Sequence, residues 1–160
     1  MTEPTASRAS LPEDYGLPPD SELLPWSYVD ERLRAAMHYW LASVGPDGAP
    51  HARPIDGMWL DARLYFGGGA DTRWVRNITA NPSVTVHLPE AEQAVIIDGA
   101  VSTTKPDANL AQRLADESNR KYDYGQTAAD YEGVEVFMFT PSVAFAWKTL
   151  FKDATRFRFE

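Results

Sequence analysis

Residues 50–88 read PHARPIDGMWLDARLYFGGGADTRWVRNITANPSVTVHL, and this stretch indicates the fold class. Its residues alternate in the two-residue period of β-strands, except after a triple glycine, where a helical period begins. The pattern predicts a strand, a tight turn, a return strand, a short helix capped by Asp71 or Thr72, and a further strand. The expected bounds, in that order, are Pro50–Leu60, Asp61–Ala62, Arg63–Gly67, Arg73–Ile78 and Ser83–Leu88. The centre of the chain is therefore expected to be an antiparallel meander.

The flanking segments continue this pattern. Ser27 is expected to cap a helix that reaches Ala36, and Thr104 to cap a longer helix that ends near Lys121. Pro141-Ser142 is expected to separate two late strands. The strands expected outside the central stretch are Tyr39–Val44, Ala94–Thr103, Gly133–Thr140, Val143–Leu150 and Ala154–Phe159. About eight short antiparallel strands with two or three helices predict a mainly β fold with α, a barrel or a sandwich, rather than a Rossmann sheet.

Length and composition narrow the class of protein. The chain has 160 residues, enough for one ordinary domain, and residues 1–25 are rich in proline, serine and acidic residues. We expect residues 1–25 to be an extended or disordered arm and residues 26–160 to be the folded domain. A net charge of −8 argues against nucleic-acid binding, and the absence of cysteine excludes disulfides and thiolate chemistry. The three histidines lack metal-ligand spacing, so no metal is expected.

The chain has no sequence feature of a membrane or secreted protein. No apolar run reaches the length of a membrane helix, and the first ten residues lack the apolar stretch of a signal peptide. We therefore expect a soluble protein of the cytoplasm without membrane contact.

Gly67–Gly69 and the helix start that follows form the strongest candidate site. Exposed backbone N–H groups and the positive end of a helix favour a phosphate there. Thr72 can donate a hydrogen bond, and Arg73 can pair with two phosphate oxygens at once. The alternative is a capped helix that carries surface arginines.

The order of PHARPIDGMW, a return strand and GGGADTRWVRNITANPSVTVHL resembles the pyridoxamine phosphate oxidase-like superfamily. The resemblance covers about Leu33 to Glu160 and is strongest to small actinobacterial-type proteins that use FMN or the deazaflavin F(420). It implies an FMN-binding-like split β-barrel that forms a homodimer, with the cofactor between the subunits. An aromatic content of 12% also fits a dimer interface.

The same resemblance assigns roles to residues of this chain. Four would lie along the cofactor ring; five belong to the glycine-rich segment and the helix after it, where Thr72 and Arg73 would hold the phosphate; and two from the C-terminal hairpin would approach the ring from the second subunit. In that order these are Arg53, Pro54, Ile55 and Asp56; Gly68, Thr72, Arg73, Trp74 and Arg76; and Trp147 and Lys148. Trp74 stands where the family often has lysine, and Arg76, two residues later, is the candidate replacement for that cation.

The implied function is hydride transfer between F(420) or FMN and a small organic molecule. His51, Tyr122 and Tyr124 are the expected substrate contacts, and spacing marks no catalytic acid or base. F(420) would need a basic channel for its anionic tail, and the chain offers four candidates for it. These are Arg53, Arg73, Arg76 and Lys148.

Several alternatives remain open on the sequence alone. The barrel is otherwise a non-catalytic flavin, haem or small-molecule binder, or a dimer that has lost its cofactor. His51 and Arg53 are otherwise exposed residues paired with acids such as Asp61 or Glu135. Trp147 is otherwise part of a core face with Val143 and Phe145, with Lys148 in solvent.

Overall fold

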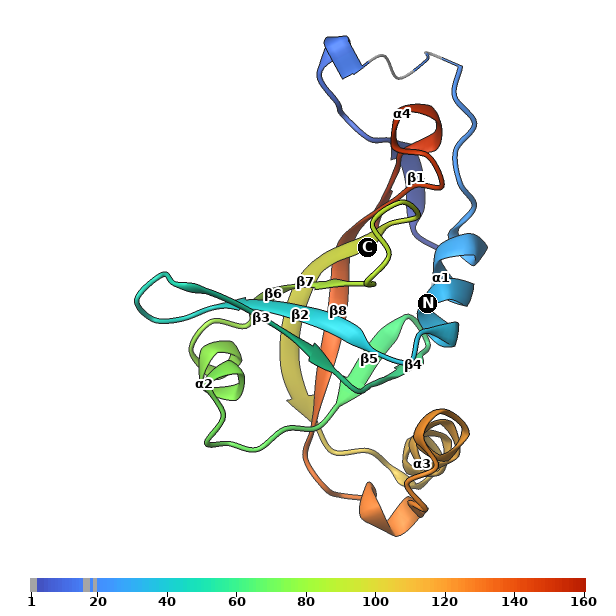
Figure 1. Ribbon diagram of the computed structural model, residues 1–160. Coiled ribbons are helices and arrows are strands. Elements are labelled where there is room, and N and C mark those ends of the chain that lie inside the picture. Colours follow the sequence, from blue (N-terminus) through green and yellow to red (C-terminus); the bar gives the residue numbers. More distant parts are fainter. Residues whose placement is uncertain (1–2, 16–17, 19) are drawn as a thin grey trace.

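A computed structural model describes residues 3–15, 18 and 20–160, and its architecture is a split antiparallel barrel (Figure 1). The described residues form one sheet in the order β1-β9-β8-β7-β6-β2-β3, with β4 paired to β5 and β5 paired to β8. The strands are β1 Thr5–Arg8, β2 Tyr39–Val44, β3 Pro50–Ile55, β4 Met58–Leu60, β5 Arg63–Phe66, β6 Ser83–His87, β7 Val95–Thr104, β8 Val136–Ala146 and β9 Thr155–Arg158. The predicted mainly β fold with helices is confirmed.

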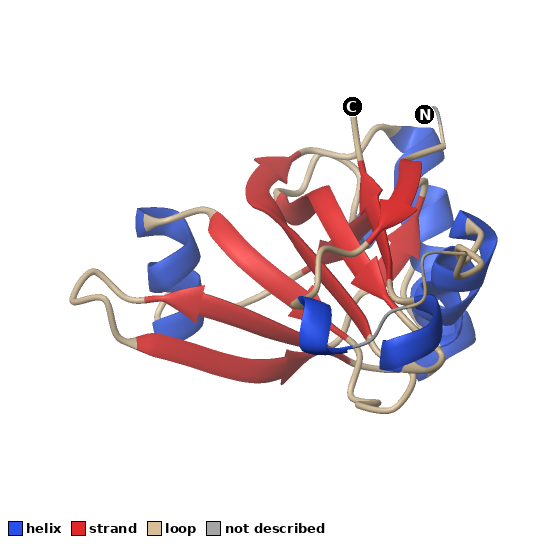
Figure 2. Cartoon of the chain, turned by 90° about the horizontal axis from the view of Figure 1, so that it is seen from above, coloured by secondary structure: helices blue, strands red, loops and turns tan. Residues whose placement is uncertain are grey.

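In the described part of the chain, three α-helices of eight residues or more accompany the sheet. They are α1 Trp26–Ala35, α2 Arg73–Ala80 and α3 Ala108–Tyr122, and a shorter helix, α4, covers Leu150–Asp153. Figure 2 shows α2 apart from the other helices, beside the β2–β3 hairpin. The side-chain amide of the buried Asn77 on α2 donates to the Ser43 hydroxyl on β2 at 3.2 Å, which holds this helix to the sheet.

Two of the predicted helix caps are wrong. Pro25, not Ser27, is the N-cap of α1, and the carboxylate of Asp30 in this helix accepts a hydrogen bond from the Trp59 indole at 2.8 Å. Thr104 is still part of β7, so α3 begins later, and the Asp107 carboxylate accepts from the Leu110 N–H at 2.8 Å. Thr104 is taken by the sheet, where it pairs with Val136, so strand pairing overrides its propensity for a cap. Ser27 lies inside the first turn of α1, because that helix begins one residue earlier, at Trp26.

The two strands expected around Pro141-Ser142 are one continuous strand, β8, which corrects the prediction. The β7–β8 register shifts between Asp98 and Gly99, and Gly99 pairs with Pro141. Proline is tolerated at such a bulge because one ladder hydrogen bond is already missing. A side chain at position 99 would stand 2.2 Å from the Thr140 carbonyl oxygen, so this close approach requires glycine.

The single strand expected from Pro50 to Leu60 is divided at Asp56-Gly57, which is a second correction. β3 pairs with β2, whereas β4 pairs with β5, so the chain changes partner at this break. The predicted turn at Asp61-Ala62 is confirmed, with both residues in the left-handed region at φ 51° and 55°. The break matters for the site because it leaves Asp56 outside both ladders.

The core fills the barrel and extends beneath α3. The largest fully buried side chains include Tyr39, Trp59, Phe66, Phe139 and Phe157. A second cluster packs Met58, Leu60 and Tyr65 against Ala111 and Leu114 of α3. Tyr122, the last residue of α3, packs against the same cluster and lies beside the β3–β4 break.

Part of the predicted N-terminal arm belongs to the sheet. β1 pairs with β9, and the Leu24 N–H donates to the Thr155 hydroxyl at 2.9 Å. Residues 1–2, 16–17 and 19 of this arm lie outside the described residues. Within the described part of the chain, none of the helices combines the length and apolar character needed to cross a membrane.

Candidate functional site

A groove of about 770 Å³ opens where four parts of the chain meet. These are β3, the loop Gly67–Gly69 (the glycine loop), the start of α2 and the end of α3. This volume is within the usual range for small-molecule sites. Nine residues predicted to contact cofactor or substrate line it: Arg53, Pro54, Ile55, Asp56, Gly68, Thr72, Trp74, Tyr122 and Tyr124. Residues far apart in the sequence are thus brought into one wall, although their roles stay predictions.

Five predicted site residues lie outside this groove. His51 is on β3 opposite Ser43, toward the hairpin turn. Arg73 and Arg76 are exposed on α2, and the Arg76 guanidinium donates to the Asp71 carbonyl oxygen at 2.6 Å. The helical period could have shown this, because it places residues 73 and 76 on one face and the buried Trp74 and Ile78 on another.

Trp147 and Lys148 follow β8 at the end remote from the groove. Val136 at the start of β8 lines the groove, whereas Ala146 at its far end pairs with Val95. The Lys148 ammonium lies 4.8 Å from the centre of the Tyr28 ring. The predicted approach of these two residues to a cofactor therefore requires a second copy of the chain and stays a prediction.

The alternative core face of Val143, Phe145 and Trp147 is wrong, because Ala144 and Ala146 are the fully buried residues of this segment. Asp61 is likewise no partner for Arg53. Its carboxylate accepts two hydrogen bonds from Arg113, at 2.7 and 2.8 Å, and these lower the pKa of Asp61.

The glycine loop packs against Trp74. A side chain at Gly68 would stand 2.2 Å from the indole, so glycine is needed here for packing, whatever else the loop binds. The Arg53 guanidinium lies over the same indole, 5.5 Å from the ring centre. The Thr72 hydroxyl donates to the Gly69 carbonyl oxygen at 2.8 Å. Arg53 and the loop backbone are therefore the groups free to meet an anion.

The charges of the groove are mixed. Of the four cations expected to form a basic channel, only Arg53 lines it. Asp56, Asp130 and Glu135 line it as well, mostly on the side of the α3–β8 connection. A single chain thus offers one end of the groove with Arg53 and the Gly67–Gly69 backbone, and one acidic end, rather than a continuous basic channel.

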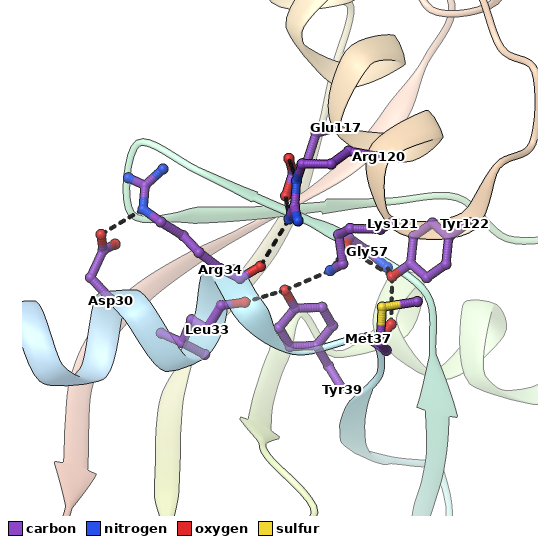
Figure 3. Close-up of polar contacts among 10 residues, drawn as sticks. All are labelled: Asp30, Leu33, Arg34, Met37, Tyr39, Gly57, Glu117, Arg120, Lys121 and Tyr122. Atoms are coloured by element: carbon purple, nitrogen blue, oxygen red, sulfur yellow. Dashed lines mark hydrogen bonds and ion pairs between the residues drawn. The ribbon is translucent and has the colours of Figure 1, made fainter.

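Lys121 and Tyr122 at the end of α3 hold the β3–β4 break in place, as Figure 3 shows. The Lys121 ammonium donates to the Gly57 carbonyl oxygen at 2.7 Å and to the Tyr39 hydroxyl at 3.1 Å. The Tyr122 hydroxyl accepts from the Gly57 N–H at 2.8 Å and donates to the Met37 carbonyl oxygen at 2.7 Å. Gly57 is therefore fixed on both backbone groups.

Burial changes the titration of this cluster. It lowers the pKa of Lys121 to about 8, because the charged ammonium is removed from water. It raises the pKa of Tyr122 to about 12 and that of Tyr39 further, because the phenolates would be charged. Sequence reasoning missed Lys121, and the position of a lysine in the last turn of a helix gives no sign of burial.

His38, also missed, completes the groove wall. Its Nδ1 lies 3.0 Å from one carboxylate oxygen of Asp56, and the Tyr124 hydroxyl lies 2.5 Å from the other. His38 and Tyr124 also line the groove. No local signal could have joined these residues, since Asp56 is 18 positions from His38 and 68 from Tyr124. Among the described residues, no group of three or more His, Asp or Glu side chains is arranged to hold a metal ion.

The comparison with known proteins is consistent with this fold and groove. The family model for pyridoxamine 5′-phosphate oxidase matches residues 28–148. No curated protein matches the chain in sequence. Among solved structures, an F(420) reductase has 25% identity and a TM-score of 0.54, with 72% of this chain and 94% of that chain covered.

Two further solved structures share the fold at lower identity. A FAD-binding protein from Mesorhizobium loti has 20% identity and a TM-score of 0.58, with 86% of this chain and 96% of that chain covered. A haem storage protein from Vibrio cholerae has 16% identity and a TM-score of 0.56, with 72% and 89% covered. At this identity the likeness concerns the fold alone. From the family match over most of its length, the chain belongs to the pyridoxamine 5′-phosphate oxidase family.

Proposed function

We propose that this chain is an oxidoreductase that binds a flavin or the deazaflavin F(420) in the groove and transfers hydride to or from a small organic molecule. The observation that supports it is the meeting of the glycine loop, the start of α2 and Arg53 at one end of the groove. The F(420) reductase among the solved structures supports the same class.

The residues at this end fit a phosphate. A side chain at Gly67 would meet no atom within 4 Å, so the loop backbone is open on that side. The first N–H groups of a helix have no partner within the helix, and those of α2 follow directly on this loop. Arg53 uses only its Nε, toward the Pro54 carbonyl oxygen at 3.2 Å, which leaves its terminal nitrogens for an anion.

The groove of one chain suits a compact phosphate better than a long anionic tail. FMN carries a single phosphate, which the glycine loop and Arg53 can contact. Trp74 weakens this fit, because it stands where the family often has a phosphate-binding lysine. F(420) has a long anionic tail and would require cations from a second copy of the chain. Arg73, Arg76 and Lys148 lie outside the groove of their own chain, and in a dimer those of one copy could reach the groove of the other. The bound cofactor supplies the hydride chemistry, and the chain orients it between β3 and the glycine loop.

Fluorescence titration of the purified protein with FMN and with F(420) tests the proposal. Arg53→Ala is expected to weaken binding by about 1.5–3 kcal/mol, the range for a hydrogen bond to a charged group. For FMN, Arg73→Ala is the matched control, because Arg73 is exposed outside the groove, and a smaller effect is expected. If neither cofactor binds the wild-type protein, the proposal fails. A larger loss for Arg73→Ala would place the phosphate on the outer face of α2.

A non-catalytic small-molecule binder is the second candidate, favoured by Trp74 in the place of a phosphate-binding lysine. Both candidates predict binding, so turnover separates them. Reoxidation of the reduced, bound cofactor by 2-cyclohexen-1-one or menadione supports the enzyme. Binding without reoxidation by a wider panel of enones and quinones supports the binder.

A further inference from the structure

Three segments of the chain converge on the Asp56 carboxylate at the acidic end of the groove. The Lys121 and Tyr122 contacts described above fix Gly57 and Met37, the neighbours of Asp56 and His38 (Figure 3). The convergence of His38 and Tyr124 on Asp56 is therefore built on a buried framework, although the three side chains are themselves open to solvent.

The bonding pattern fixes the tautomer of His38. The Tyr124 hydroxyl donates to one oxygen of the Asp56 carboxylate, which raises the pKa of Tyr124. The other oxygen is 3.0 Å from His38 Nδ1 and, as part of a carboxylate, accepts a hydrogen bond. Nδ1 therefore carries a proton. His38 Nε2 has no hydrogen-bond partner among the residues that the structure describes, and the ring lines the groove.

A stack of aromatic rings lies beside this imidazole. The Tyr122 and Tyr124 rings are stacked at 5.1 Å, and the His38 ring lies 6.3 Å from that of Tyr122. Asp123 adopts the left-handed conformation at φ 55°, and this turn brings Tyr124 back over Tyr122. Tyr124 is 57% exposed and lines the groove, so a planar ligand can reach its ring from there.

We infer that His38 is the proton donor for a planar, conjugated carbonyl acceptor, such as an enone or quinone, that stacks beside Tyr124. This inference rests on the proposed function. A reduced flavin or deazaflavin, when bound, would supply hydride, with its electron pair, to the acceptor. The Nε2–H of protonated His38 supplies the proton, and the products are the reduced acceptor, the oxidised cofactor and neutral His38. Asp56 is a positioning residue, because it keeps the Nδ1 proton in place throughout.

The test compares His38→Gln with His87→Gln. His87 stacks on Trp40, 6.2 Å away, outside the groove, so its substitution controls for loss of a histidine. Cofactor affinity is measured first, by fluorescence, and then single-turnover reoxidation by 2-cyclohexen-1-one and menadione across pH. His38→Gln is expected to bind cofactor within about twofold of wild type but to slow reoxidation by about 10²-fold or more, the usual contribution of a general acid. It should also lose the pH dependence and solvent isotope effect of that step.

Asp56→Asn provides a second variant and a readout independent of turnover. Long-range ¹⁵N–¹H NMR spectra of the free protein report which ring nitrogen of His38 carries the proton. The Nδ1–H form is expected in the wild type and a reduced share of it in Asp56→Asn, with a reoxidation rate between those of wild type and His38→Gln. The charged and titratable groups around His38 that enter this comparison are Asp56, Tyr122 and Tyr124, together with Lys121, which interacts with Asp56 and Tyr122.

The outcomes separate the two proposals. Failure of the wild-type protein to bind either cofactor would overturn the proposed function and this inference with it. Cofactor binding without reduction of either acceptor overturns the assigned acceptor class. Equal reoxidation rates in His38→Gln and wild type, or an Nε2–H form of His38, would overturn only the role of His38.

Discussion

Lys121 shows how one buried charge is held at the site. Its Nζ is 4.7 Å from the centre of the Tyr39 ring and 5.2 Å from that of Tyr122, in addition to its two hydrogen bonds. Burial disfavours the ammonium, whereas the Gly57 carbonyl and the two ring faces favour it. The side chain is therefore close to a balance between its two protonation states at mildly alkaline pH.

This balance predicts a pH-dependent stability. The folded pKa of about 8 lies below the ordinary value of 10.5, so between these two values the unfolded chain binds more protons than the folded chain. The contribution of Lys121 to the free energy of unfolding should therefore rise as pH increases from about 8 toward 10. Urea unfolding at about pH 7.5 and pH 9.5 measures it, and Lys121→Met should lack this rise.

Lys121→Met should also be less stable than wild type by about 1–3 kcal/mol at neutral pH, because the Gly57 carbonyl and the Tyr39 hydroxyl lose a donor. The comparison must stay below about pH 10. Above it, the raised pKa values of Tyr122 and Tyr39 make the unfolded chain lose protons first, which lowers stability. If the free energy of unfolding changes by the same amount between the two pH values in wild type and Lys121→Met, burial does not lower the pKa of Lys121.

At the scale of elements, α2 is attached to the barrel by an aromatic cluster. The Trp74 ring lies 5.9 Å from Phe66 on β5 and 6.0 Å from Phe137 on β8. The indole also fills the space beside Gly68. Trp74 therefore holds the start of α2 to the barrel by packing.

Gly68→Ala should destabilise the protein by about 1–3 kcal/mol, because a methyl group there overlaps the indole. Gly67→Ala is the control, since a side chain at that position meets nothing within 4 Å. Chemical denaturation measures both. In the double variant with Trp74→Leu, the smaller side chain should remove much of the Gly68→Ala effect, a non-additivity typical of residues in contact. Full additivity would contradict this packing role.

At the scale of the whole molecule, the cations of the chain are distributed around the barrel. Arg53 faces the groove, Arg73 and Arg76 lie on the outside of α2, and Lys148 is at the opposite end of β8. Only an assembly of two copies would bring the last three near a cofactor. The proposed homodimer therefore predicts which cations of one copy meet the cofactor of the other: Arg73, Arg76 and Lys148.

Sedimentation velocity at micromolar concentration is expected to give twice the mass of the chain. If the dimer forms, Lys148→Ala should weaken the binding of F(420) more than that of FMN, because only the former has a long anionic tail to meet that cation. A monomer across the whole concentration range would contradict the dimer, and with it any contribution from Trp147 and Lys148.

The local pattern of the sequence determined which parts of the central and C-terminal chain are extended, the turn at Asp61-Ala62, the approximate extents of the helices and the family resemblance, because alternation, turn chemistry and helical period depend on neighbouring residues. Tertiary structure decided what depends on partners distant in the chain. The bulge at Pro141, the break at Asp56, the burial of Lys121 and the meeting of His38 with Tyr124 each follow from which strand or helix lies opposite. Strand pairing and side-chain burial are properties of the packed barrel, and no local segment contains them.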